Sequence, residues 1–393
     1  MPIIIVNIKN MKPIPYGRQF IDNKDIKLIT KSLSNDLITT GPFVKKFEKN
    51  LKKYLNCKYS YVCNSGTSAI HLALLSLGLK ENDTILMPAI NFIASYNLAK
   101  ILKLKVYLVD VDEFTGQITP EKILECIKKN KIKKIHVLIT MYYGGIPENI
   151  ENFFNLKKKF NFFLIEDACH ALGSKYKYKN KIYNIGSCKH SDISTFSLHP
   201  LKTITTGEGG VVATNNNKFA KKIELFRSHG IVKNKKYYWK YDVYEHGFNY
   251  RISDINCALG LSQLNKINFI IKKRENISNI YIDSFKDFNK DLLVPNYSKF
   301  IYPSFHLFFL NIKFSKLKKN KDHFINYLVK NKILPQQHYI PISKFKIYKE
   351  KQKFFSGAEK FFRNTISIPI YVDLDKSKQM KIINIIKNYF FIN

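Results

Sequence analysis

Short apolar runs alternate with helix-like stretches between about residue 60 and residue 215, and this alternation restricts the possible folds more than any other feature. The runs include TILMPAINF, KVYLVDVD, KKIHVLITMYY and FFLIEDA. Each run has the length of a β-strand, and strands that alternate with helices form parallel βαβ units. We therefore predict an α/β fold built on a mainly parallel sheet.

Polar side chains follow several of these predicted strands. They occur at Asn91, next to Phe92, at Tyr142 to Gly145 and at Asp167 to His170, and a lysine-containing loop follows the run SDISTFSL in the same way. Ligands of open parallel sheets gather at the carboxyl ends of the strands. The spacing therefore predicts one functional site at this edge of the sheet.

The segment STFSLHPLKTITTGEGG places Lys202 in a small, hydroxyl-rich and glycine-rich surround. Ser197 precedes the lysine, and Thr203, Thr205 and Thr206 follow it, so hydroxyls that can hold a phosphate flank the amine. A lysine that forms a Schiff base must first lose its proton, which a desolvating site favours. The alternative interpretation is a surface lysine in a loop that precedes a strand.

Two further features of the sequence suit a ligand that has both an anionic group, such as phosphate, and a cationic ring. The turn SGTSA places Gly66 and Thr67 at the start of a helix, where backbone amides attract phosphate, although an ordinary capped helix has the same pattern. Asp167 ends an apolar strand, so its buried carboxylate needs a positive partner such as a protonated pyridine nitrogen. Phe92 can cover a flat ring or belong to the core, and His170 can be chemical or simply hydrogen-bonded.

Patterning divides the chain into three parts. We predict an N-terminal arm over residues 1–20, a large α/β domain over 21–255 and a smaller α+β domain over 256–393. Helical patterning begins at residues 22–34, and residues 233–244, rich in lysine and tyrosine, are predicted to form an exposed loop.

Composition excludes several classes of protein. The formal charge of +35 raises the possibility of nucleic-acid binding, but arginine, the residue that phosphate and base recognition favours, is rare. The six cysteines form no CxxC pair, which argues against a zinc site or a disulfide framework. No apolar run reaches the length of a membrane span. We therefore expect a cytoplasmic protein that binds no metal, no nucleic acid and no membrane. The arginines are Arg18, Arg227, Arg251, Arg274 and Arg363.

The motifs SGTSA, EDACHALGS, FSLHPLKTITTGEGG, FRSHG and GFNYRISDINCALGLSQL occur in the order found in the DegT/DnrJ/EryC1/StrS sugar aminotransferases, and the chain resembles this family from Met11 onward. The ten residues before Met11 have no match. The resemblance implies the fold type I architecture of pyridoxal phosphate enzymes, with a mainly parallel central sheet and a smaller α+β C-terminal domain. It also implies pyridoxal 5'-phosphate as the cofactor.

The resemblance assigns a role to each matched position. Lys202 matches the lysine that holds the cofactor covalently and shuttles the proton. Asp167 matches the carboxylate paired with the pyridine nitrogen, and Phe92 matches the aromatic residue stacked on the ring. The remaining cofactor positions are His170 at the ring hydroxyl, and Ser197 with Gly66 and Thr67 around the phosphate. Asn249 matches an asparagine that reaches the cofactor of the neighbouring subunit, which implies a homodimer with shared sites.

Within the family, QQHYIPI and the lysine loop are most similar to the pseudaminic acid branch. This likeness implies amino transfer from L-glutamate to C4 of a UDP-linked 4-keto-6-deoxy-N-acetylhexosamine. The alternatives are another nucleotide keto-sugar, another epimer or amination at C3; the family dehydratases have histidine in place of the lysine. His338 and Tyr339 can also serve only to pack the domains together. The residues that the likeness places around the sugar nucleotide are Tyr16, Thr39, Gly66, Ser197, Asn249, His338 and Tyr339.

Overall fold

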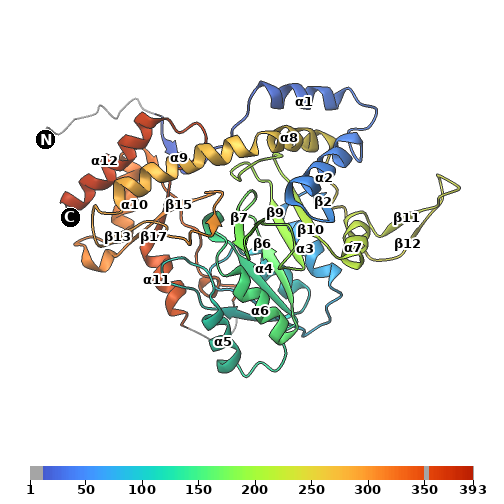
Figure 1. The fold of residues 1–393 in the computed structure, drawn as a ribbon, viewed down its shortest axis with the longest axis horizontal. Helices are drawn as coiled ribbons and strands as arrows, with labels where there is room; N and C mark the ends of the chain where they lie inside the picture. Colours follow the sequence, from blue (N-terminus) through green and yellow to red (C-terminus); the bar gives the residue numbers. More distant parts are fainter. Residues whose placement is uncertain (1–11, 349–353, 393) are drawn as a thin grey trace.

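The computed structural model describes residues 12–348 and 354–392, so the predictions for residues 1–11 lie outside the described part. A seven-stranded sheet forms its centre (Figure 1). The strands are β2 (Tyr59–Cys63), β3 (Thr84–Pro88), β4 (Lys105–Val109), β5 (Val137–Met141), β6 (Phe163–Asp167), β9 (Ile193–Ser197) and β10 (Gly210–Thr214).

The strand order is β2-β10-β9-β6-β5-β3-β4, and only β10 runs antiparallel to its neighbours. The mainly parallel sheet predicted from the alternating runs is therefore confirmed. Its register places Met141 beside Asp167, and Asp167 beside Thr195. The carboxyl ends of six strands consequently meet at one edge of the sheet.

Helices cover both faces of this sheet. Helix α3 packs with α4 and α7, whereas α8 packs with α1 and α2, and α5 contacts α6. Asp254 fixes the start of α2, because its carboxylate accepts the Phe43 and Val44 N–H groups at 3.1 and 2.8 Å. The bounds are α1 (Asn23–Leu33), α2 (Pro42–Leu55), α3 (Gly66–Ser76), α4 (Ala94–Ile101), α5 (Pro120–Lys129), α6 (Ile150–Phe160), α7 (Asn217–Arg227) and α8 (Asp254–Asn265).

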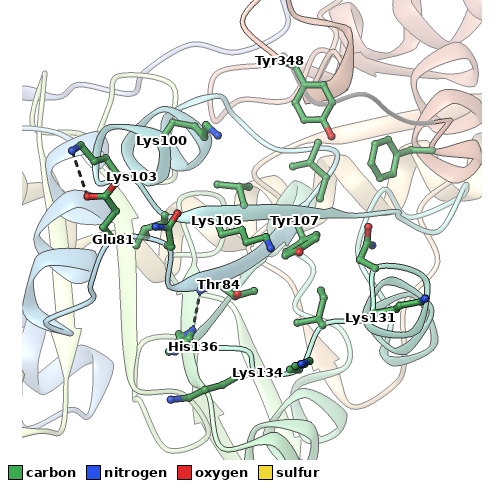
Figure 2. Close-up of a pocket in the computed structure, with 18 residues that line it drawn as sticks. Glu81, Thr84, Lys100, Lys103, Lys105, Tyr107, Lys131, Lys134, His136 and Tyr348 are labelled. Atoms are coloured by element: carbon green, nitrogen blue, oxygen red, sulfur yellow. Dashed lines mark hydrogen bonds and ion pairs between the residues drawn. The ribbon is translucent and has the colours of Figure 1, made fainter.

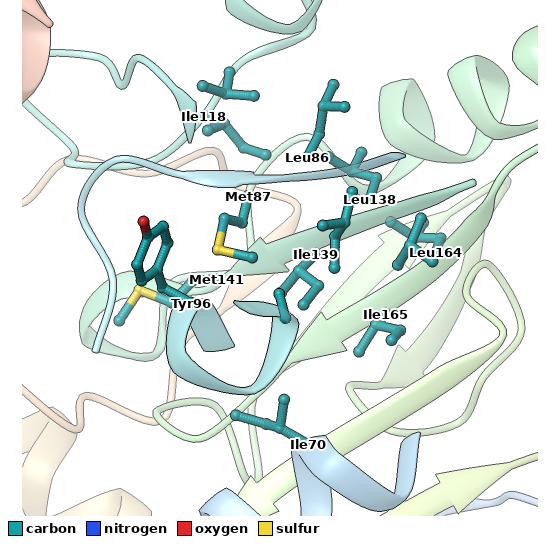
Figure 3. Close-up of a cluster of buried hydrophobic side chains, with 14 of the residues drawn as sticks. Ile70, Leu86, Met87, Tyr96, Ile118, Leu138, Ile139, Met141, Leu164 and Ile165 are labelled. Atoms are coloured by element: carbon teal, nitrogen blue, oxygen red, sulfur yellow. The ribbon is translucent and has the colours of Figure 1, made fainter. Parts of the chain in front are cut away.

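The main core lies between the sheet and the helices. Figure 3 shows part of it, where Met87, Ile139 and Ile165 from neighbouring strands lie on the same side of the sheet as Ile70 of α3 and Tyr96 of α4. Strands buried on both faces read as continuous apolar runs, which explains the pattern in the sequence. The core therefore holds the strand ends, and the loops that follow them, in a fixed arrangement.

The C-terminal part forms a second, smaller layer around the antiparallel sheet β13-β15-β17. The predicted boundary between residues 255 and 256 lies inside α8, so the division into domains stays a prediction. Strand β1 (Ile14–Pro15) joins the arm to this part, because it pairs with β16 (Ile333–Leu334). The other elements are α9 (Ile267–Phe285), β13 (Leu292–Leu293), β15 (Phe308–Ile312), α10 (Lys321–Lys330), α11 (Ser356–Asn364), β17 (Thr365–Ile368) and α12 (Lys376–Ile392).

Two small β-structures lie outside these layers. Strand β7 (Lys175–Tyr178) pairs with β8 (Lys181–Asn184) on one side and with β14 (Ile301–Tyr302) on the other. Strands β11 (Ile231–Lys233) and β12 (Tyr241–Val243) form a hairpin that projects from the body of the molecule (Figure 1). The segment predicted as an exposed loop is thus exposed but ordered into two strands. None of the helices in the described residues is both long enough and apolar enough to span a membrane.

Candidate active site

A cavity of about 510 Å³ opens at the sheet edge where the parallel strands end. It is lined from the large part of the chain by residues that follow β2, β3, β6 and β9, and from the small part by residues 336–339. The predicted site residues that line it are Tyr16, Gly66, Thr67, Phe92, Asp167, His170, Ser197, Lys202, His338 and Tyr339.

Lys202 extends from the loop after β9 into this cavity. Burial lowers the pKa of its amine, while the nearby Asp167 and Cys169 act in the opposite direction. Lys202 forms no ion pair with any residue that the structure describes. The interpretation as a surface lysine is therefore wrong, because the amine lies in a cavity where burial favours its neutral form.

The hydroxyls around Lys202 shape its loop rather than line the cavity, with Ser197 as the exception. Thr205 donates its hydroxyl to the Leu198 carbonyl at 3.1 Å, and Thr206 donates to the Glu208 carbonyl at 2.7 Å. Both threonines are buried. The loop is thus closed at its base by its own side chains, which holds the lysine at the sheet edge.

Asp167 is the last residue of β6 and only 3% exposed. Its carboxylate accepts the Cys169 N–H at 3.2 Å and the Ser95 hydroxyl at 3.5 Å, but it has no cationic partner within 4.0 Å among the described residues. Burial raises the pKa of this carboxyl above its ordinary value, although the Cys169 bonds and the Lys202 charge oppose the shift. A carboxylate so buried needs a positive group supplied by a ligand.

The amino terminus of α3 faces the same cavity. Ser65 caps the helix by accepting the Ser68 N–H at 3.0 Å, and the first helical residues, Gly66 and Thr67, line the site. A Cβ at Gly66 would lie 2.8 Å from the Cβ of Ser197. The glycine therefore lets the Ser197 side chain approach the helix end, where backbone N–H groups favour an anion such as phosphate.

The small part closes the other side of the cavity. Tyr339 forms a hydrogen bond of 2.9 Å to His170 Nε2, and His338 Nδ1 forms one of 2.9 Å to the Ser367 hydroxyl. Burial lowers the pKa of His338 to about 3 and that of His170 well below its usual range. These histidines are thus neutral hydrogen-bonding groups, and the buried His170 Nδ1 has no partner among the described residues.

One predicted residue lines the cavity but is exposed, and two others lie outside it. Phe92 is 55% exposed at the cavity, so it is not a core residue. Thr39 and Asn249 do not line the cavity of their own chain. Thr39 forms an isolated bridge to Ser253, and Asn249, which is exposed, forms one to Ser228.

Several lining residues escaped the sequence predictions. His306, from the run FHLFFLNIKF, lies with its ring 4.3 Å from that of His170. Asn91, predicted at a strand end, also lines the cavity: its side-chain oxygen accepts the Phe92 N–H at 2.7 Å, and its side-chain amide bonds to Asp167. His306 reaches the site by tertiary packing, which no short motif reveals. The other polar ones are Ser65, Cys169, His199, Glu208, Gln336 and Gln337, and the apolar ones are Ile70, Ala94, Met141 and Leu201.

A larger hollow of about 1010 Å³ lies at the opposite edge, where β3 and β4 begin (Figure 2). Lys100, Lys103 and Lys105 line it together with three further lysines of the α5–β5 connection. Lys103 pairs with Glu81 at 3.4 Å, and His136 accepts the Thr84 N–H at 2.9 Å. All six lysines and Glu81 are exposed, in contrast to the buried Asp167 of the smaller cavity. The cavity at the carboxyl edge is therefore the candidate active site.

The smaller cavity fits pyridoxal phosphate by its own chemistry. Asp167 offers a buried negative charge for the ring nitrogen, α3 offers unpaired N–H groups for the phosphate, and Lys202 offers an amine for the aldehyde. No cluster of three or more potential metal ligands occurs in the described residues.

The fold and the site together define a pyridoxal phosphate-dependent aminotransferase. Comparison with known families then gives the particular group: the model of the DegT/DnrJ/EryC1/StrS aminotransferase family matches residues 19–387, and the chain belongs to this family. The resemblance found in the sequence motifs is thereby confirmed.

Relatives of assigned function are similar over nearly their whole length. A Campylobacter jejuni UDP-4-amino-4,6-dideoxy-N-acetyl-beta-L-altrosamine transaminase is 37% identical over 92% of this chain and 93% of its own. The GDP-perosamine synthase of Escherichia coli O157:H7 is 31% identical over 97% and 99%. Among solved structures, Helicobacter pylori PseC, an aminotransferase of pseudoaminic acid biosynthesis, superposes with a TM-score of 0.87 at 29% identity, covering 97% of this chain and 100% of that one.

Proposed function

We propose that this protein transfers the amino group of L-glutamate to C4 of a UDP-linked 4-keto-6-deoxy-N-acetylhexosamine, in the biosynthesis of a pseudaminic acid-type glycan. The observation that carries the proposal is that Lys202 and Asp167 line one cavity together, which the polar segment 336–339 also lines. The 37% identity to a transaminase of this name supports the choice of substrate.

Bound pyridoxal phosphate would supply an electron sink that stabilises negative charge at the carbon bearing the amino group. Asp167 would hold the protonated ring nitrogen, and the amino terminus of α3 with Ser197 would hold the phosphate. Phe92 would cover one face of the ring. The unpartnered His170 Nδ1 is placed to contact a polar group of the ring.

Lys202 would have two roles in the reaction. Its lowered pKa favours the neutral amine, which is the nucleophile that attaches the cofactor. Once released, the same amine would move a proton from Cα of glutamate, and in the second half-reaction it would deliver a proton to C4 of the sugar.

Recognition of the sugar would come from polar groups at the mouth of the cavity. Tyr16, His338 and Tyr339 supply hydroxyl and imidazole groups there, whereas Thr39 and Asn249 would act only from a neighbouring subunit. We therefore include a homodimer with shared sites in the proposal. The six cysteines are free thiols, which supports a cytoplasmic location.

The decisive experiment is to incubate the enzyme with L-glutamate and each 4-keto-6-deoxy UDP-N-acetylhexosamine epimer and to determine the C4 configuration of the product by NMR. We expect amination at C4 of the L-configured sugar, with weaker use of the D-epimer. Lys202→Ala serves as the inactive control.

A second candidate is an aminotransferase for another nucleotide keto-sugar, because GDP-perosamine synthase is 31% identical over nearly the full length. A GDP-linked 4-keto sugar belongs in the same assay for this reason. A clear preference for that sugar or for the D-epimer, or amination at C3, would overturn the pseudaminic acid assignment and leave the aminotransferase assignment intact.

A further inference from the structure

Lys321 is a partly buried lysine whose charge is directed into the protein. Its ammonium donates to the side-chain oxygen of Gln337 and to the backbone carbonyl of Phe362, and it lies 4.7 Å from the centre of the Phe362 ring. Lys321 is the first residue of α10, where the helix dipole disfavours a cation. The Phe362 carbonyl, near the end of α11, provides the opposite and favourable end of a helix.

Gln337 belongs to the segment 336–339 that lines the candidate active site. On one side of it, Gln336 exchanges two backbone hydrogen bonds with Ser367, at 3.0 and 2.9 Å. On the other side, His338 bonds to the Ser367 hydroxyl and Tyr339 bonds to His170. Of the contacts in the described residues, the Gln337 side-chain oxygen has only the one to Lys321.

The charged groups around Lys321 are few. Asp322 follows it on α10, and Lys344 lies 5.2 Å from the centre of the same Phe362 ring while pairing with Glu359 at 2.7 Å. Burial lowers the pKa of Lys321 to about 7, and only Asp322 opposes the shift. The ammonium is therefore held by carbonyl dipoles and an aromatic ring rather than by a carboxylate.

We propose that Lys321 is a positioning residue, which ties the segment 336–339 to the end of α11 and thereby sets the affinity for the sugar nucleotide. The second half of this statement rests on the proposed function. Lys321 does not line the cavity, so its effect on the substrate passes through Gln337 to the adjacent His338 and Tyr339.

This arrangement predicts that loss of the Lys321 charge weakens substrate binding without lowering the stability of the fold. A buried cation without a carboxylate partner costs desolvation energy, which an apolar side chain of similar length avoids. Lys321→Met is therefore expected to keep or raise the melting temperature of the holoenzyme while weakening substrate binding. A residue that only stabilised the fold would lower the melting temperature instead.

The first measurement is steady-state kinetics with the UDP-linked 4-keto sugar. We expect Lys321→Met to raise KM roughly tenfold with kcat within about twofold, and Lys321→Arg to stay within about threefold of wild type, because the guanidinium keeps the charge. The matched control is Lys344→Met, which removes a cation from the same ring without touching Gln337, and it should leave KM unchanged.

The pH profile gives a second kinetic readout. As pH rises through about 7, Lys321 loses its charge, which weakens its hydrogen bonds to the two carbonyls, so the wild-type KM should rise between pH 6 and pH 8. Lys321→Arg should show no such rise, since its charge does not titrate in this range. The same rise in both proteins would overturn the proposal.

Hydrogen–deuterium exchange of the holoenzyme tests the positioning without any sugar. Peptides covering residues 334–342 should exchange faster in Lys321→Met and in Gln337→Leu, and at the wild-type rate in Lys344→Met. If Lys321→Met does not fold, the exchange rate of these peptides in Gln337→Leu tests the positioning role instead.

Unchanged exchange in the Gln337 variant, or an equal change in the Lys344 control, would refute the positioning role. Faster exchange in a protein that aminates no UDP sugar would instead reject the proposed function and keep the positioning role.

Discussion

Lys202 and Asp167 define the chemistry at the scale of single residues, because each has a charge that burial opposes. The amine is shifted toward its neutral form and the carboxyl toward its protonated form. Burial of these two groups does not stabilise the cofactor-free protein. It prepares them instead for a ligand that supplies an aldehyde and a cationic ring nitrogen. The residues that do chemistry here thus reduce the stability of the fold that holds them.

Borohydride reduction of the enzyme loaded with pyridoxal phosphate should attach a pyridoxyl group to Lys202. The reason is that its amine faces the cavity and its pKa is lowered by burial, whereas lysines such as Lys45 are exposed. Peptide mass spectrometry identifies the modified residue, with Lys202→Ala as the control. A pyridoxyl group on another lysine of the wild-type protein would refute the assignment.

Asp167→Asn should lower kcat by a factor of about 100 or more, as loss of a preorganised electrostatic group commonly does. The same substitution should leave the stability of the cofactor-free protein unchanged or raise it. The raised pKa means that the unfolded state ionises first as pH increases, so the carboxyl destabilises the cofactor-free fold more at pH 7 than at pH 4.

The melting temperature of cofactor-free Asp167→Asn should therefore equal or exceed that of wild type at pH 7, with a smaller difference at pH 4. Thermal melts at the two pH values measure this, and the exposed Asp36→Asn is the matched control. A marked loss of stability at pH 7 would show that the carboxylate is satisfied within the chain.

At the scale of elements, the carboxyl edge of the sheet brings together loops that are far apart in the chain. The end of β9 and the start of α3 approach so closely that Gly66 lies against Ser197. Two effects compete at this position. Alanine is a better helix former than glycine by up to about 1 kcal/mol, yet its methyl group would displace Ser197.

Gly66→Ala should raise the dissociation constant of pyridoxal phosphate about tenfold, because displacement of Ser197 from the phosphate site outweighs the gain in helix propensity. Absorbance titration of the cofactor measures the change. Gly17→Ala is the control, since its Cβ would meet only Leu201 at an ordinary 3.8 Å. Equal affinities in the two variants would contradict the close-approach explanation.

At the scale of the whole molecule, two exposed features bear on the proposed homodimer, namely Asn249 and the projecting β11–β12 hairpin. Asn249 lies outside the cavity of its own chain although the family motif assigns it to the cofactor site. Both observations agree with the proposed dimer, in which one protomer completes the site of its partner.

Mixing Lys202→Ala with Asn249→Ala chains should therefore restore activity. A heterodimer has one site with both defects and one intact site, so random pairing should give about a quarter of wild-type activity. Amination assays before and after subunit exchange measure the recovery. No recovery after confirmed exchange would argue against shared sites.

The sequence by itself determined the features that local physics controls. Alternating apolar runs predicted the parallel sheet, because strands buried on both faces must be continuously apolar. The surround of Lys202 and the strand-end position of Asp167 predicted the two central residues of the site, since each depends on its own neighbours. The family motifs added the cofactor.

Only the tertiary structure decided what depends on distant packing. It showed that Thr205 and Thr206 close the lysine loop instead of lining the cavity, and it brought His306 to the site from a run that reads as an ordinary strand. It also joined Lys321 to Gln337 across separate elements. Such contacts join residues far apart in the chain or depend on how a loop closes, so no local pattern of polarity, capping or spacing records them.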